Sequence, residues 1–217
     1  MVDTWTAIFL RNYVILSRVF KVRAMIPSEE GVFVFDKNIR QWRKACFEGP
    51  YVPKSDGVYL FYFRNFNCIG CKAFDRIWNE ILKKYINEIH GELIMVQCTN
   101  FFYECRDSCA SDTFVLFLVT ATPQLLVVIV ERGELRYVER EIGVLSIDKV
   151  LEFVNRARER MVKYERQAIS EESEEEGVFI EFEGDWKKVV EKIRKLLFEG
   201  RNIREVCDES GCRLYVE

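Results

Sequence analysis

Two periods of hydrophobic and polar residues alternate along the chain, and each change of period marks the boundary of an expected element. Short runs rich in β-branched and aromatic residues predict strands at residues 31–35, 58–63, 92–98, 124–130 and 135–142. Apolar residues spaced three and four apart predict helices from Asp36 to the Gly49-Pro50 step, after Cys71 as far as Ile86, and from Ser146 to Met161. Because strands and helices alternate in the first half, we expect those strands to be parallel, whereas the last two strands form a hairpin.

The stretch 99–120 is less regular. Its continuous apolar run Phe114–Val119 suits a buried helix or a buried strand, and we favour a helix.

Both ends of the chain differ from this central pattern. Residues 5–20 have apolar side chains at helical spacing, which indicates an N-terminal helix that packs on its own domain, docks or dimerises, or lies on a membrane surface. Residues 170–177 hold five glutamates in eight positions and predict a solvated linker. We therefore expect a helical extension (1–30), a main domain (31–169), the acidic linker (170–177) and a small C-terminal α/β unit (178–217) with a strand at 178–182.

Composition narrows the class of protein. The 217 residues are 49% hydrophobic, and 32 basic against 35 acidic residues give a formal net charge of −3, without the basic block of a nucleic-acid binder. No uncharged apolar run reaches the ~20 residues of a membrane span, and the start lacks the order of a signal peptide. We expect a cytoplasmic protein. Its 26 glutamates against 9 aspartates, with 4 glutamines, suit a thermophile, in which intracellular disulfides occur.

The sequence Cys68-Ile69-Gly70-Cys71 carries the strongest chemical signal. It lies where an apolar strand meets a long amphipathic helix, and the amide groups and dipole at a helix N-terminus favour a thiolate on Cys68. A C-x-x-C pair also forms half of many zinc sites, but a zinc ribbon needs a second such pair and the chain has none. A reactive dithiol is therefore the leading hypothesis.

The order of elements and three local patterns resemble the thioredoxin family over about residues 31–165. The patterns are Cys68 to Lys72 opening a helix, Thr122 to Leu126 opening a strand, and Arg132-Gly133-Glu134 with Ile142-Gly143 before the final helix. The resemblance implies an α/β fold with a central mixed sheet flanked by helices. To this fold the chain adds the N-terminal helix and the small C-terminal α/β unit.

The resemblance also implies a function, thiol–disulfide exchange with protein substrates and no cofactor. Cys68, as the more exposed thiol, would attack a substrate disulfide, and Cys71 would resolve the mixed disulfide. Thr122 and Pro123, joined by a cis peptide bond, would lie beside the dithiol and bind the substrate chain strand to strand. The expected partners are protein disulfides or dithiols, an unidentified reductase or electron donor and, through the N-terminal helix, a second copy of the chain.

The sequence departs from the family pattern around the dithiol. Tyr62 stands where thioredoxins usually carry a buried acid, Asn67 replaces a tryptophan, and Ile69-Gly70 replaces the common Gly-Pro. These departures leave proton transfer at Cys71 and the redox direction open. The positive charges of Arg64 and Lys72 are candidates for lowering the thiol pKa.

The remaining cysteines leave several interpretations open. Cys98, Cys105 and Cys109 are expected near the dithiol as an auxiliary redox pair, a metal site, structural disulfides or inert packing, and buried cysteines are most often one of the last two. Cys207 and Cys212 are candidates for a structural disulfide that staples the C-terminal unit. We expect no metal. The alternative to an enzyme is a redox-inert binding or scaffold protein that keeps the fold and uses its cysteines only as structural bridges.

Overall fold

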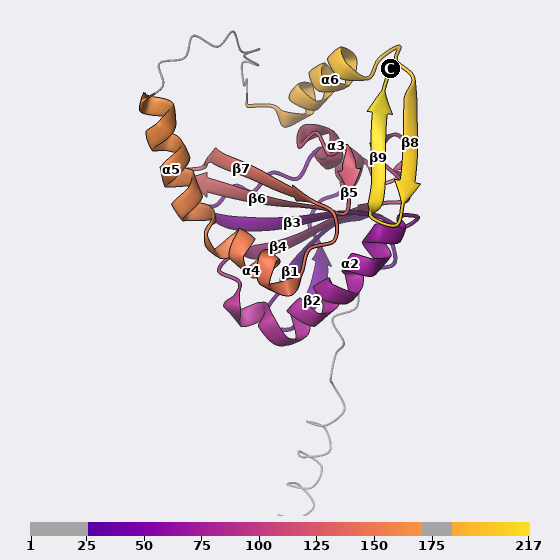
Figure 1. Cartoon of the computed structure of the whole chain (residues 1–217). Coiled ribbons are helices and arrows are strands. Elements are labelled where there is room, and N and C mark those ends of the chain that lie inside the picture. Colours follow the sequence, from indigo (N-terminus) through magenta and orange to yellow (C-terminus); the bar gives the residue numbers. More distant parts are fainter. Residues whose placement is uncertain (1–25, 171–183) are drawn as a thin grey trace, which may run out of the picture.

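A six-stranded mixed sheet forms the centre of the molecule (Figure 1). The computed structural model describes residues 26–170 and 184–217. The strand order in the sheet is β2-β1-β4-β3-β6-β7. The strands are β1 (Gly31–Asp36), β2 (Gln41–Lys44), β3 (Gly57–Asn65), β4 (Glu92–Cys98), β6 (Gln124–Glu131) and β7 (Glu134–Ile142).

Strand β3 is the central strand of the sheet and leads to the dithiol. It pairs with β4 in parallel and with β6 in antiparallel orientation. All its residues from Val58 to Asn65 are buried, since side chains on both faces of the sheet pack against other elements. This two-sided burial explains why its sequence is an unbroken apolar run rather than an alternating one.

Helices and short helical turns cover the two faces of the sheet. Helices α2 (Ile69–Glu80), α4 (Ile147–Asn155) and α5 (Ala157–Ser170) lie on one face, and α3 (Ser108–Leu116) lies on the other (Figure 1). The helix predicted after Cys71 is confirmed, although it continues as a π-helical turn (Ile81–Tyr85) and a 3₁₀ turn (Ile86–Glu88). A further 3₁₀ turn, Phe102–Glu104, precedes α3.

Several other predicted elements are also present. The helix favoured for Phe114–Val119 is present only in part, because α3 ends at Leu116 and residues 117–119 lie beyond it. Strands β6 and β7 form the expected hairpin. Ser146 caps α4, because its side chain accepts a hydrogen bond from the Lys149 amide. The expected N-terminal helix, the acidic linker and the strand at 178–182 lie outside the described residues, apart from Ser170 at the end of α5.

The helix predicted from Asp36 is wrong. The Asp36 carboxylate accepts hydrogen bonds from the Asn38 and Ile39 amides, which closes a tight turn into strand β2. Ile39, expected on a buried helix face, is 53% exposed, while Trp42 packs edge-on against Phe35 with ring centroids 5.0 Å apart. Apolar residues at helical spacing therefore led to a wrong prediction, because this segment forms a turn closed by the Asp36 side chain, followed by a strand with alternating burial.

The predicted parallel direction holds for β3 and β4 but is wrong for β1. Strand β1 pairs with β4 in antiparallel orientation, with Gly31 opposite Gln97 and Val34 opposite Ile94. The prediction relied on a crossover helix between β1 and β3. Because a hairpin to β2 replaces that helix, the chain returns along the sheet edge without the parallel crossover.

The C-terminal segment rests on the main domain. It consists of α6 (Trp186–Leu197), β8 (Ile203–Asp208) and β9 (Gly211–Val216), and β9 pairs with the short strand β5 (Ala121–Thr122) in a second sheet. Val190 and Ile193 of α6 are buried, and Arg194 donates hydrogen bonds to Ser111 and Asp112 of α3 at 2.8 and 2.9 Å. The segment therefore packs its apolar side on α3 rather than forming a core alone.

None of the helices within residues 26–170 and 184–217 combines the length and the apolar character needed to cross a bilayer.

Candidate redox site

Strand β3 and helix α2 position the two thiols. Cys68 is the N-cap residue of α2, and its sulfur accepts a hydrogen bond from the Cys71 amide at 3.0 Å. Cysteine at an N-cap thus takes the place of the usual oxygen-bearing side chain and satisfies one of the unpaired amides of the first turn. Cys71 lies one turn along the helix, and both residues are free cysteines.

The surroundings of the two sulfurs lower the pKa of Cys68 and raise the pKa of Cys71. The hydrogen bond from the Cys71 thiol lowers the pKa of Cys68 to about 7, aided by the backbone amides of Cys71 and Cys212 and opposed by burial. Burial is the main cause that raises the pKa of Cys71 well above its ordinary value, followed by its interaction with Cys68. At neutral pH the pair therefore holds a thiolate at Cys68 and a proton at Cys71.

Thr122 and Pro123 lie beside the dithiol, where the resemblance placed them. The Thr122–Pro123 peptide bond is cis. The Thr122 carbonyl oxygen is 3.4 Å from the Cys68 sulfur and accepts the hydrogen bond of its thiol form. This proximity arises because β6, which begins directly after Pro123, runs antiparallel to β3, which ends before Cys68.

The prediction that Cys68 is the more exposed thiol is wrong. Cys68 and Cys71 both have 0% exposure. The turn between β8 and β9 covers them: a Cβ atom on Gly70 would lie 2.5 Å from the Ser210 carbonyl oxygen, and one on Gly211 would overlap the Thr122 carbonyl oxygen. Glycine at positions 70 and 211 is therefore what allows the C-terminal hairpin to lie directly on the dithiol.

A buried polar network missed by the sequence analysis lies beneath Cys71. The Tyr62 hydroxyl donates to the Asp75 carboxylate at 2.9 Å, and it also lies 3.2 Å from the Cys71 carbonyl oxygen. Arg64 forms an ion pair with Asp75 at 2.9 Å and donates to Gln97 at 2.8 Å. Arg64 is thus committed to Asp75, whereas Lys72 is exposed at the surface.

Tyr62 stands at the position where thioredoxins usually carry a buried acid. The carboxylate of Asp75 lies next to Tyr62 and so supplies an acid close to that position. Burial raises the pKa of Asp75, and the positive charge of Arg64 opposes that rise. The signal in the sequence was the i, i+4 spacing from Cys71, which places Asp75 one helical turn further along the same side of α2.

The other cysteines form three disulfides within the described residues. Cys98 pairs with Cys105, and Cys109 pairs with Cys46, a residue that the sequence analysis left without a role because it lay in the wrongly predicted helix. Cys207 pairs with Cys212 across β8 and β9. Since a cysteine binds a metal as a thiolate, these bonded sulfurs are not metal ligands in this state.

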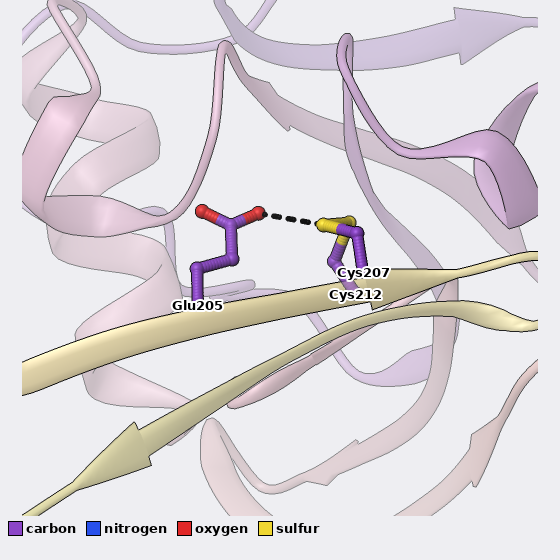
Figure 2. Close-up of side chains that lie close together, drawn as sticks. All are labelled: Glu205, Cys207 and Cys212. Atoms are coloured by element: carbon purple, nitrogen blue, oxygen red, sulfur yellow. Dashed lines mark hydrogen bonds between the residues drawn. A yellow bond between two sulfur atoms is a disulfide. The ribbon is translucent and has the colours of Figure 1, made fainter.

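Glu205 lies beside the third disulfide. One of its carboxylate oxygens is 3.3 Å from the Cys207 sulfur, and Figure 2 shows the two side chains on the same side of the hairpin. The Tyr103 hydroxyl donates to the other carboxylate oxygen at 2.8 Å. Burial raises the pKa of Glu205.

Among known proteins, the chain is similar to a solved structure. No family model and no curated protein matches the chain. Thioredoxin from Aeropyrum pernix, a solved structure, is similar at 19% identity with a TM-score of 0.39, covering 61% of this chain and 95% of that one. The assignment of a thioredoxin-like fold rests on the topology itself, in which a β3-α2-β4 unit, a β6-β7 hairpin and α4 frame a C-x-x-C pair.

Proposed function

We propose that this protein is a thiol–disulfide oxidoreductase that exchanges disulfides with protein substrates. In this function Cys68 is the nucleophile and Cys71 the resolving thiol. The observation that carries the proposal is the N-cap geometry: the Cys68 sulfur accepts the Cys71 amide at 3.0 Å, in surroundings that lower its pKa to about 7. A thiol of that pKa is substantially ionised at neutral pH without losing its nucleophilicity.

The reaction has two exchange steps. The Cys68 thiolate attacks one sulfur of a substrate disulfide and releases the other as a thiolate. Cys71, after losing its proton, then attacks Cys68, which frees the substrate and leaves a Cys68–Cys71 disulfide. Because burial favours the neutral Cys71 thiol, this second step needs a base. We assign proton removal to the Tyr62–Asp75 network beneath it, and the physiological reductant or electron donor completes the cycle.

Thr122 and Pro123 would hold the substrate. Thr122 belongs to the short strand β5, and its carbonyl oxygen lies 3.4 Å from the Cys68 sulfur. Because β9 already pairs with β5, a substrate chain must first displace β9; paired with β5 in its place, it would present its own backbone, and a cysteine in register, to Cys68.

The rival function is a redox-inert binding or scaffold protein, and the full burial of Cys68 and Cys71 favours it. Insulin reduction by dithiothreitol separates the two. The oxidoreductase accelerates precipitation of the insulin chains, and Cys68→Ser removes the acceleration. Cys98→Ser/Cys105→Ser, which removes a neighbouring disulfide, is the control and retains it. A wild-type chain that gives no acceleration while keeping its circular dichroism spectrum would contradict the oxidoreductase.

A further inference from the structure

Strand β9 occupies the position that a bound substrate strand would take. Its residue Cys212 pairs with Thr122 and Arg213 pairs with Ala121, in antiparallel register. The Leu214 amide donates to the Thr120 carbonyl oxygen at 2.7 Å, which extends the pairing by one residue. The C-terminal hairpin is thus added to β5 as an extra strand, directly beside the residue that faces Cys68.

The residue in register with Thr122 is itself half of a disulfide. Cys212 has 0% exposure and lies in the same buried cluster as Cys68 and Cys71, and its backbone amide contributes to the lowered pKa of Cys68. Its partner Cys207 lies on the edge strand β8 and is exposed. One cysteine of this disulfide is therefore buried in the cluster that holds the dithiol, and the other is exposed to solvent.

The two other disulfides differ in their position relative to β5, although Cys98 and Cys109 belong to the same buried cluster. Cys46–Cys109 joins the segment after β2 to α3, and Cys98–Cys105 joins the end of β4 to the loop before α3. Neither is paired with β5. Of the three, only the hairpin disulfide stands in the place of a substrate disulfide.

We propose that Cys207–Cys212 is an internal redox partner of Cys68 and Cys71, so that the hairpin relays electrons between the buried dithiol and protein thiols or disulfides outside. The Cys68 thiolate attacks the Cys212 sulfur, a Cys68–Cys212 bond forms, and the Cys207–Cys212 bond breaks. Cys71 then attacks Cys68, releasing Cys212 as a thiolate. The dithiol is oxidised to a Cys68–Cys71 disulfide, and Cys207 and Cys212 are reduced to two thiols. Because Cys68 starts as a thiolate, the dithiol releases one proton, that of Cys71, and the second proton comes from Glu205, which regains it from solvent.

Glu205 supplies the proton for the leaving group. Its carboxyl oxygen is 3.3 Å from the Cys207 sulfur, and burial keeps a larger fraction of this carboxyl protonated than in an exposed glutamate (Figure 2). A protonated carboxyl at this distance donates to the departing Cys207 thiolate and disfavours its return. Tyr103, whose hydroxyl donates to the other oxygen, holds the carboxyl in place.

The relay rests on the proposed function, because both use Cys68 as the nucleophile. Trapping the Cys68–Cys212 intermediate tests the relay. The full-length Cys71→Ser chain, which lacks the resolving thiol, is treated with iodoacetamide, digested and mapped by mass spectrometry without reduction. We expect a Cys68–Cys212 cross-link together with alkylated Cys207, and an intact Cys98–Cys105 bond. An intact Cys207–Cys212 bond with alkylated Cys68 would overturn the relay.

A matched pair of variants tests the register. Cys71→Ser/Cys207→Ser leaves Cys68 and Cys212, whereas Cys71→Ser/Cys212→Ser leaves Cys68 and Cys207. On mild oxidation with glutathione disulfide, the first should form its internal bond about tenfold faster or more, because only Cys212 is in register with Thr122. Equal rates would overturn the relay.

The same samples separate failure of the relay from failure of the proposed function. A Cys68–glutathione mixed disulfide without a Cys68–Cys212 bond means that the nucleophile is active and the relay is wrong. If Cys68 forms neither bond in a chain that retains its circular dichroism spectrum, the proposed function itself is contradicted.

Discussion

The disulfides Cys46–Cys109 and Cys207–Cys212 differ in the length of the loop that they close and in the structure around them. The first closes a loop of 63 residues and ties an irregular segment to helix α3. The second spans five residues and joins two positions that are already neighbours across the paired strands β8 and β9. In the chain-entropy model a cross-link stabilises more when it closes a longer loop, and strand pairing has already ordered the short one.

This difference indicates what each bond contributes. The contribution of Cys46–Cys109 to stability is enough to explain its position, because this bond anchors a segment with little regular structure. Cys207–Cys212 adds less to stability, yet it lies on the dithiol, in register with Thr122 and beside Glu205. The disulfide expected from the sequence is present, and the proposed relay accounts for its position.

The largest expected difference between the two disulfides is in the free energy of unfolding lost when each is removed by itself. We expect Cys46→Ala/Cys109→Ala to lower the free energy of unfolding by about 4 kcal/mol, and Cys207→Ala/Cys212→Ala by about 2 kcal/mol or less, following the loop-length dependence. Guanidinium denaturation under non-reducing conditions measures both. Equal losses would mean that the short bond is as much a structural staple as the long one, and the comparison would fail.

Loosening the hairpin without touching a sulfur is a milder test. In Gly70→Ala the new Cβ would lie 2.5 Å from the Ser210 carbonyl oxygen, so the hairpin must shift. Overpacking of this kind costs about 1–3 kcal/mol, and we expect alkylation of Cys68 by iodoacetamide to become about tenfold faster or more. Gly57→Ala is the control, because its Cβ meets only ordinary contacts at 3.5 Å or more. An unchanged rate in Gly70→Ala would show that the hairpin does not control access to Cys68.

The central fold and the dithiol were predictable because they depend on local patterns. The apolar run of β3 and the three- and four-residue spacing after Cys71 specify a strand and a helix, and the junction between them places Cys68 at a helix N-terminus. Pro123 was placed correctly because antiparallel pairing of β6 with β3 follows from the order of elements.

What could not be predicted depends on contacts between segments far apart in the chain. The pairing of Cys46 with Cys109 and the docking of β9 on β5 leave no periodic signal in the sequence. The exposure of Cys68 was wrong for the same reason, because the residues that bury it follow it by more than 140 positions. The turn closed by Asp36 was missed for a different reason, since its apolar neighbours imitated a helix.

The most direct test of the account is the pH dependence of Cys68 alkylation, measured on the reduced dithiol of the full-length chain by quantifying the Cys68 peptide. We predict that the rate falls about tenfold per pH unit below its midpoint and levels off above it, with the midpoint at about 7. Cys71→Ala, which removes the thiol donor to Cys68, should move the midpoint upward. A wild-type midpoint at ~8.5, the value of an ordinary cysteine, or higher would mean that burial outweighs the hydrogen bonds and would contradict a primed nucleophile.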